Sequence, residues 1–221
     1  MIYRYLSHPL MSAVPVYGGV ASIECRKIKA IEHGNSANTF SFTMENHWGT
    51  HIDSPNHFFS NGQKIADYPP EFWLFKSPQV IRINLEPAEI LICGSWIEAV
   101  KPASDILLLK SMWSNFRWQD IYGTENPGIH PDVAFYLREK FPNIRAIGID
   151  WISVSSYKER NTGRETHRAF LDPDGLNHPI LIIEDMDMSF ESESLEDVFA
   201  VPLRIDCIDS APCTVIGGFG D

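Results

Sequence analysis

The chain lacks any long apolar stretch. No run of about 18 or more apolar residues occurs, and a helix that crosses a bilayer needs a run of that length. The first 20 residues include Arg4, His8 and two prolines, and they lack the apolar centre of a secretory signal peptide. We therefore expect no membrane span, no cleaved signal and no membrane partner.

Basic side chains are scarce relative to acidic ones. The 221 residues contain 18 Lys and Arg against 29 Asp and Glu, which gives a formal net charge of −11. Proteins that bind nucleic acid or an anionic membrane surface through charge need basic patches. The balance argues against a nucleic-acid partner and leaves small-molecule substrates open.

Cysteine is also infrequent. The four cysteines are Cys25, Cys93, Cys207 and Cys213, and no two of them form a C-x-x-C pair. This pattern is typical of reduced thiols in the cytoplasm, where we expect the protein to be located. Cys207 and Cys213 could bridge across a turn, although no feature of the sequence requires that they pair.

What the sequence does contain is the composition of a folded protein. Apolar residues make up 44% of the chain and charged residues 21%, as in soluble globular proteins. The length suits one domain over residues 1–221 with a sizeable core. We find no internal repeat, low-complexity tract or linker that would divide it.

Hydrophobic patterning predicts a mixed α/β domain. Residues 13–45 are expected to be extended, with breaks at Gly18-Gly19 and at residues 33–35. The best helix covers residues 131–141, between Pro131 in its first turn and a following proline. The acidic run 191–197 indicates a solvated face or a loop. Short strands are predicted over residues 79–85, 105–110, 144–149, 179–183, 201–205 and 213–219.

Three histidines and an aspartate occur within eleven residues, in the segment H-W-G-T-H-I-D-S-P-N-H that begins at residue 47. If residues 47–53 are extended, His47, His51 and Asp53 project from one face, because strand side chains alternate. Gly49 on the same face would leave room for an ion or a substrate. Imidazole and carboxylate are ligands of Zn²⁺, and also of Mn²⁺ or Fe²⁺. The pattern favours a metal site over a chance cluster held in a structural network.

The last histidine of the segment follows a proline. Pro55 ends strand pairing, so His57 is expected on a loop at the rim of the site. A histidine there can titrate near neutral pH and transfer protons.

The whole segment resembles the H-x-G-T-H-x-D-x-P-x-H signature of the cyclase family, whose best-known enzymes are bacterial kynurenine formamidases. The likeness continues at residues 15–19 (P-V-Y-G-G), 166–171 (T-H-R-A-F-L) and 179–184 (P-I-L-I-I-E). It implies the family's swivelling β/β/α fold, a mixed sheet with a few helices, assembled as a homodimer or larger homo-oligomer. Every fixed position of the signature is present: His47, Gly49, Thr50, His51, Asp53, Pro55 and His57.

The resemblance also implies a metal content of two zinc ions per chain, with Mn²⁺ as an alternative. Carried over by motif, His47, His51 and Asp53 would bind one ion. The other ion would be bound by Asp53, His167 and Glu184.

Further roles follow from the same resemblance, together with two departures from the family pattern. His57 would be the catalytic acid/base, and Tyr17 would stack on the substrate where the formamidases usually place a Trp. Gly18 stands where a Pro is usual. The segment between His167 and Glu184 is longer than expected for the family because of residues 172–178, and it contains His178 as a rival metal ligand. We expect Thr50 to support the metal-binding strand by hydrogen bonding.

The implied activity is hydrolysis of an amide bond in a small aromatic substrate, as in the conversion of N-formylkynurenine to kynurenine and formate. A metal-held hydroxide would attack and His57 would transfer the proton. The alternatives are a ring-opening lactam or lactone hydrolase of the isatin-hydrolase kind and a catalytically silent, metal-dependent binding domain. His57 favours an enzyme, since a binding domain has no evident use for an acid/base. Aromatic side chains suit an aromatic substrate, although core packing accounts for most of them: Trp48, Phe58, Phe59, Phe72, Trp73, Trp113 and Trp151.

Overall fold

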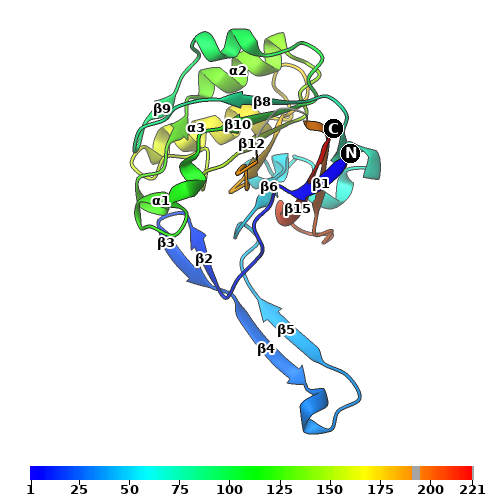
Figure 1. The fold of residues 1–221 in the computed structure, drawn as a ribbon. Coiled ribbons are helices and arrows are strands. Elements are labelled where there is room, and N and C mark those ends of the chain that lie inside the picture. The colour runs from blue at the N-terminus through cyan, green and yellow to red at the C-terminus, as the bar shows by residue number, and fades with distance from the viewer. Residues whose placement is uncertain (191–194, 221) are drawn as a thin grey trace.

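A mixed nine-stranded sheet runs through the computed structural model, which describes residues 1–190 and 195–220 (Figure 1). Its strand order is β7-β14-β15-β6-β13-β12-β10-β8, and β1 pairs with β15. The strands are β1 (Ile2–Tyr5), β6 (His51–Asp53), β7 (Leu74–Phe75), β8 (Pro78–Arg82), β10 (Ile106–Lys110), β12 (Ala146–Ile149), β13 (Leu181–Glu184), β14 (Leu195–Pro202) and β15 (Ser210–Phe219).

Shorter elements surround this sheet. Three two-stranded ribbons pair β2 (Ala13–Val16) with β3 (Gly19–Ser22), β4 (Glu24–Lys29) with β5 (Thr39–Thr43), and β9 (Ile90–Leu91) with β11 (Gly128–Ile129). The α-helices are α1 (Ile121–Thr124), α2 (Pro131–Lys140) and α3 (Arg160–Leu171). Single 3-10 turns are η1 (Ile31–His33), η2 (Pro55–His57), η3 (Ile65–Asp67), η4 (Pro70–Trp73), η5 (Ser95–Ala99) and η6 (Trp113–Phe116).

The parallel half of the sheet is built from uninterrupted apolar runs. Strands β8, β10, β12 and β13 are parallel neighbours, and every residue of β10, β12 and β13 is buried. Sheets covered on both faces select such runs. Alternate residues enter two cores: Leu107 and Leu109 join the core that includes α2 and α3, while Ile106 and Leu108 join the core that includes β14 and β15.

Strand β6 joins the two halves of the sheet. It lies antiparallel to β13 on one side and to β15 on the other. All three of its residues are buried. The segment that carries the histidine–aspartate motif therefore enters the centre of the molecule, between the parallel half and the antiparallel half (Figure 1).

Most elements agree with the sequence-based predictions. The mixed α/β class is confirmed, and the helix predicted over residues 131–141 is α2, which ends one residue earlier. His130 caps it, since its side chain accepts a hydrogen bond from the Asp132 amide. The strand predicted over residues 79–85 ends sooner, at Arg82.

The prediction of a strand over residues 201–205 is wrong in its second half. Strand β14 ends at Pro202, and Leu203 follows it with an exposed side chain. Proline has no amide hydrogen to donate to a neighbouring strand, which weakens strand pairing at this position. Of the acidic run 191–197, residues 191–194 lie outside the described residues. The remainder begins β14, with Glu196 exposed.

The structure also shows the state of the cysteines and the length of the helices. All four cysteines are free thiols; Cys207 is exposed and Cys213 is buried in β15. Within residues 1–190 and 195–220, no helix combines the length and the apolarity needed to cross a bilayer.

The long segment 172–178 is held by one buried arginine of α2. The Arg138 guanidinium donates to the carbonyl oxygens of Ala169, Asp172, Leu176 and Asn177, at 2.8 to 3.1 Å. His178 follows with an exposed side chain, and its ring nitrogens contact the carbonyls of Pro179 and Pro142 instead of other histidines. His178 is therefore not part of the cluster, because both of its ring nitrogens face backbone carbonyls.

Replacing Arg138 by Met should destabilise the fold. The change keeps much of the apolar stem but leaves carbonyl oxygens without a donor, which costs about 2–4 kcal/mol in total. Thermal and urea unfolding would measure the loss. Lys140→Met on the exposed side of the same helix is the matched control, and equal stability of the two variants would contradict this account.

Candidate metal centre

The motif begins in a turn and enters a strand only at its fifth residue. Residues 46–50 form turns and bends, and β6 covers His51 to Asp53 alone. The expectation that residues 47–53 are one extended segment is wrong, because Gly49 has a φ of +68°, which reverses the chain. His47 reaches Asp53 through this turn and not through strand alternation.

Gly49 has a different function from the one its position suggested. A Cβ atom at Gly49 would lie 2.5 Å from the Leu10 side chain, so the residue permits close packing and a left-handed backbone, not access for an ion. Thr50 acts as expected: its hydroxyl donates to the Asp185 carbonyl and accepts from the His8 amide. The turn before β6 is therefore held by hydrogen bonds that join Thr50 to two other segments of the chain.

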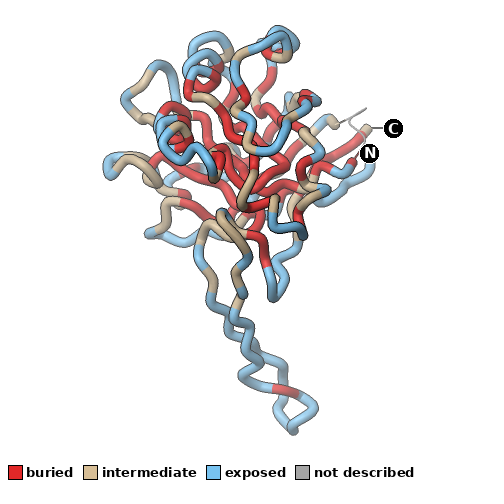
Figure 2. The backbone as a smooth tube through the Cα atoms, turned by 90° about the vertical axis from the view of Figure 1, so that its left-hand side faces the viewer, coloured by how far each residue is buried: buried red, intermediate tan, exposed pale blue. Residues whose placement is uncertain are grey.

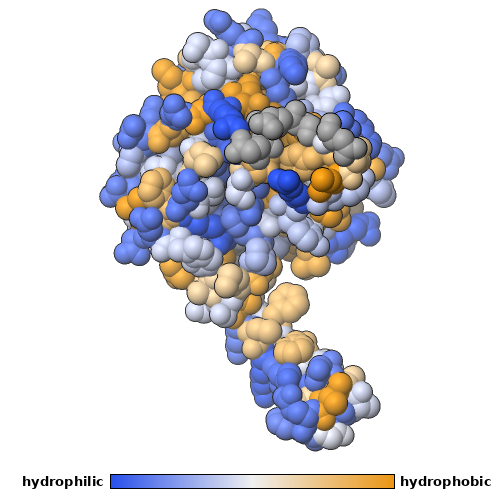
Figure 3. Space-filling model, viewed as in Figure 1, coloured by the Kyte–Doolittle hydropathy of each residue, from blue (hydrophilic) through white to orange (hydrophobic). Residues whose placement is uncertain are grey.

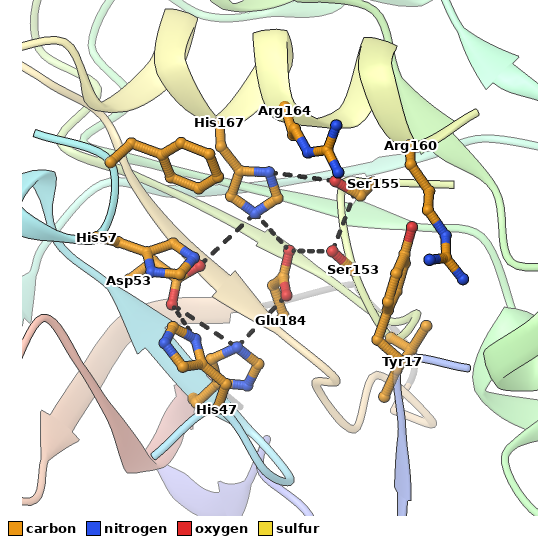
Figure 4. Close-up of a pocket in the computed structure, with 13 residues that line it drawn as sticks. Tyr17, His47, Asp53, His57, Ser153, Ser155, Arg160, Arg164, His167 and Glu184 are labelled. Atoms are coloured by element: carbon orange, nitrogen blue, oxygen red, sulfur yellow. Dashed lines mark hydrogen bonds and ion pairs between the residues drawn. The ribbon is translucent and has the colours of Figure 1, made fainter. Parts of the chain in front are cut away.

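Strand register and one helix complete the cluster. Glu184 at the end of β13 pairs with His51 across the antiparallel β6–β13 ladder. Helix α3 lies above the two strands and points His167 down at them (Figure 4). His51 Nε2 lies 3.4 Å from Glu184 Oε2 and 3.7 Å from Asp53 Oδ1. His167 Nε2 lies 3.5 Å from Glu184 Oε1 and 3.7 Å from Asp53 Oδ2.

Both buried histidines have their second nitrogen committed to the backbone. His51 Nδ1 donates to the Gly49 carbonyl and His167 Nδ1 donates to the Gly163 carbonyl, each at 2.8 Å. In the neutral form this leaves each Nε2 as a bare lone pair directed at carboxylate oxygens. Such backbone bonds are typical of histidines that bind metals, because they fix the ring and its tautomer.

The two carboxylates are buried and charged. Burial alone would raise the pKa of Glu184, but when His167 and His51 carry a proton on Nε2 their hydrogen bonds outweigh burial and lower the pKa to about 2. Ser153 Oγ and the Val154 amide also donate to Glu184 Oε1. Burial would likewise raise the pKa of Asp53, and His47 holds it well below the usual range.

The donor set fits a divalent metal. Nitrogen and carboxylate atoms that face each other repel unless a proton or a metal cation lies between them. Asp53 Oδ1 is buried and accepts no hydrogen bond, although His47 Nδ1 lies 3.1 Å away. Two atoms that bind one Zn²⁺ tetrahedrally at ~2.0–2.2 Å are roughly 3.3–3.6 Å apart. The cluster distances of 3.1 to 3.7 Å are close to that range.

Asp209 is a site residue that the sequence did not indicate. Its Oδ2 accepts from His47 Nε2 at 3.2 Å and from His57 Nδ1 at 2.7 Å. It lies just before β15, in a stretch without any motif, so no local pattern could have identified it. Strand β15 brings it to the motif by pairing with β6. His57 itself lies on η2 at the edge of the site, as Pro55 predicted.

A cavity of about 320 Å³ opens over the cluster. Phe58 forms one wall and stacks on His167, with ring centroids 5.0 Å apart. Tyr17 forms another wall, and its hydroxyl donates to the Ser156 carbonyl. Of the seven Trp and Phe residues that the sequence offered for an aromatic substrate, Phe58 alone lines this cavity. Trp113 and Trp151 lie in the hydrophobic core.

Helix α3 contributes two further side chains that sequence reasoning missed. Arg160 and Arg164 line the cavity, with Arg160 beside Tyr17 and Arg164 next to Ser155 (Figure 4). They precede His167 by seven and three residues, a spacing that places all three on one side of a helix. A helix prediction over residues 160–171 would have found them.

The Tyr17 loop departs from the family pattern for a backbone reason. Gly18 has a φ of +90°, and its amide donates to the Gly123 carbonyl at 2.8 Å. Proline is restricted to a φ near −65° and has no amide hydrogen, so it would not fit this loop. The glycine is therefore part of how this chain places Tyr17.

The metal-free protein should lose stability as the pH rises above neutral. Asp209 and Asp53 outweigh the effect of burial and raise the pKa of His47 to about 10. A raised pKa contributes stability that is complete below the unfolded value of ~6.5 and is lost as the pH rises through the folded value. Urea unfolding of metal-free protein between these limits would measure it. His47→Gln should flatten the profile, and an unchanged slope in that variant would contradict the assignment.

Known proteins resemble this chain both in sequence and in fold. A kynurenine formamidase from Bacillus cereus is 26% identical over 212 residues, covering 96% of this chain and 94% of the relative. Isatin hydrolase A from Labrenzia aggregata, in complex with benzyl benzoate, superposes with a TM-score of 0.78 at 20% identity, covering 98% of this chain and 93% of the other. A potential metal-dependent hydrolase with cyclase activity superposes with a TM-score of 0.69 at 21% identity, covering 98% and 96%. Residues 5–156 match the family model named Putative cyclase, and the chain therefore belongs to the cyclase family.

Proposed function

We propose that the chain is a metal-dependent hydrolase that cleaves an amide bond other than a peptide bond in a small aromatic substrate, in the manner of an arylformamidase. The observation that carries the proposal is Asp53, a buried carboxylate with histidines on both sides: His47 at 3.1 Å and His167 at 3.7 Å. A carboxylate in that position can bridge two cations. The similarity to kynurenine formamidases over most of the chain supports the same activity.

The residues divide between two metal positions. We assign His47, His51 and Asp53 to one ion, and Asp53, His167 and Glu184 to the other. Imidazole and carboxylate donors suit Zn²⁺, with Mn²⁺ as the alternative. When bound, such ions polarise a carbonyl group and lower the pKa of water.

His57 is assigned the proton transfer. Asp209 accepts from its Nδ1 at 2.7 Å, which leaves Nε2 to exchange a proton with the reacting groups. A water molecule adds its oxygen to the carbonyl carbon, His57 takes a proton from it and gives a proton to the nitrogen, and the C–N bond breaks to leave a carboxylic acid and an amine. A carboxylate that holds a histidine in one tautomer serves acid/base chemistry, and a silent binding domain would have no use for it.

The cavity supports an aromatic substrate with an acidic group. Tyr17 and Phe58 offer ring faces, and Arg160 and Arg164 offer guanidinium groups that can bind a carboxylate. N-formylkynurenine has both features, since it is an aryl formamide that carries an amino-acid carboxylate. Isatin is uncharged and would use only the ring faces.

A lactam or lactone hydrolase of the isatin-hydrolase kind is the second candidate. The similarity of fold to isatin hydrolase A favours it, although a likeness at 20% identity shows the fold alone. The two candidates differ in substrate and share the same metal and proton-transfer residues. We also place the enzyme in the cytoplasm, in keeping with its free thiols, and propose that it acts as a homodimer or larger homo-oligomer.

A hydrolysis screen of metal-loaded protein tests the function. The panel contains N-formylkynurenine, formanilide, isatin and a simple lactone, each with Zn²⁺ or Mn²⁺ supplied. We expect N-formylkynurenine to be hydrolysed with a higher kcat/KM than formanilide, which lacks the carboxylate. Hydrolysis of isatin alone would favour the second candidate, and no turnover of any compound by metal-loaded protein would contradict the proposal.

Two substitutions should separate proton transfer from metal binding. His57→Ala should keep the metal content and lower kcat by about 10²–10⁴-fold, because only the acid/base is removed. Asp53→Ala should lose metal as well as turnover, because both ions share that carboxylate. Elemental analysis and steady-state kinetics would measure the two effects, with exposed His178→Ala as the control. Wild-type activity in Asp53→Ala would rule out the shared-ligand scheme.

A further inference from the structure

Asn126 is a fully buried asparagine between α1 and β11, with 0% of its surface exposed. Residues 126–129 are all buried, and buried backbone forms the interior of the body that Figure 2 draws in red. Hydrophilic side chains cover much of the face drawn in Figure 3, and asparagine is usually found on such a surface. An amide group in the interior needs hydrogen-bond partners there, and they show what the residue holds.

The partners of Asn126 lie mainly in one loop. Its amide nitrogen donates to the carbonyl oxygens of Pro127 at 2.9 Å, Ser153 at 3.2 Å and Ser155 at 2.7 Å. Its Oδ1 accepts from the Tyr157 amide at 3.1 Å. Residues 153–157, which we call the site loop, belong to no helix or strand. A single side chain therefore holds the middle and both ends of this loop.

The site loop contacts two of the residues assigned to the metals. The Ser153 hydroxyl and the Val154 amide donate to Glu184 Oε1, at 3.0 and 2.7 Å. Ser155 Oγ lies 3.3 Å from His167 Nδ1. Hydrogen bonds of this kind orient metal ligands, and their loss typically lowers metal affinity. The position of the loop therefore bears on how well Glu184 and His167 are aimed.

The same loop supports the aromatic wall of the cavity. The Ser156 carbonyl accepts from the Tyr17 hydroxyl at 2.9 Å. The ring of Tyr157 meets the ring of Tyr17 edge to face, with centroids 5.2 Å apart. A Cβ atom at Gly18 would lie 2.6 Å from the Tyr157 ring, so the hairpin and the loop are closely packed. A shift of the loop would displace Tyr17 together with the hydrogen bonds on Glu184.

The residues that follow Asn126 hold the site loop through their backbone. The Ile129 amide donates to the Val154 carbonyl at 2.9 Å. A Cβ atom at Gly128 would lie 2.7 Å from the Ser156 amide nitrogen, so only glycine permits this close approach. The segment 126–129 and the site loop are therefore in direct contact along their length, and Asn126 supplies the side-chain hydrogen bonds between them.

We propose that Asn126 is a positioning residue, which sets the geometry of Glu184 and of the Tyr17 wall together by holding the site loop. Asn126 does not line the cavity, so it acts through the loop and not on the substrate. It should govern metal affinity and KM, whereas kcat depends on the proton transfer by His57, which lies on η2. The effect on KM rests on the proposed function, and the effect on metal affinity needs no turnover.

Asn126→Asp tests the proposal, because it keeps the shape of the side chain and replaces the donor by an acceptor. Asn126→Ser is the second variant, which removes the amide group without adding a charge. Competition with a chelator should show Zn²⁺ bound at least about 10-fold more weakly in both. With Zn²⁺ saturating, KM for N-formylkynurenine should rise about 10-fold, as the loss of one good contact implies. The value of kcat should change by less than about threefold, since the acid/base is untouched.

Two controls separate positioning from stability. Asn143→Asp removes an exposed amide that donates to the Pro102 carbonyl at 2.8 Å, and Val198→Ala opens a cavity in the core that includes β14 and β15. Val198→Ala should lower the temperature of unfolding, and both controls should keep wild-type Zn²⁺ affinity and KM.

Three results would overturn the proposal. They are wild-type Zn²⁺ affinity in the two Asn126 variants, a change in only one of Zn²⁺ affinity and KM, and an equal loss of Zn²⁺ affinity in Val198→Ala. If wild-type protein hydrolyses no substrate, the proposed function fails by itself. Amide hydrogen exchange of residues 17–18 then replaces KM: faster exchange in the Asn126 variants supports the proposal, and unchanged exchange overturns it.

Discussion

Two carboxylates buried side by side are the constraint on which the rest of the site depends. Asp53 and Glu184 are almost fully shielded from water, where an isolated negative charge is very costly. Histidines supply the compensating groups, and their second nitrogens are fixed by the carbonyls of Gly49 and Gly163. A structure that holds such a cluster in the absence of metal must accept extra protons. One that binds a divalent cation releases them, and metal affinity is then linked to pH.

The sheet explains why this cluster can be held so closely. Strand β6 is buried between β13 and β15, so its side chains have little freedom to move. The antiparallel register with β13 places Glu184 directly opposite His51. Helix α3 then covers the opening with His167, and Thr166 in the same turn donates to the Ile129 carbonyl, which fixes the helix against β11. Metal ligands placed on strands and packed helices are held more precisely than ligands on loops.

The residues at the rim of the site lie on turns and loops, whereas the buried cluster lies mainly on strands and a helix. His57 and Tyr17 lie on a 3-10 turn and a hairpin loop, and each is held by one hydrogen bond, to Asp209 and to the Ser156 carbonyl. In the proposed function these are the residues that meet the substrate and the departing group. The hairpin with Tyr17 is followed directly in the chain by a second hairpin, formed by strands β4 and β5.

The sequence by itself determined the local chemistry. Residues 47–57 place three imidazoles and a carboxylate within one short stretch, and a proline and a glycine shape the backbone between them. Continuous apolar runs such as residues 106–109 marked strands buried on both faces, and Pro131 marked the start of α2. These features depend on neighbouring residues, and neighbouring residues are what a linear pattern records. The resemblance to a known family extended the prediction to His167 and Glu184.

Only the tertiary structure decided how the remote residues join that cluster. Asp209 has no motif around it and becomes a partner of His57 because β15 pairs with β6. His178 is close to Glu184 in sequence, yet its ring nitrogens contact the carbonyls of Pro179 and Pro142, and Arg138 binds the carbonyls of the residues before it. The expected extended strand over residues 47–53 failed for a related reason, since Gly49 turns the chain where alternation alone would continue it. Strand register and packing join residues more than a hundred positions apart, and no local periodicity contains that information.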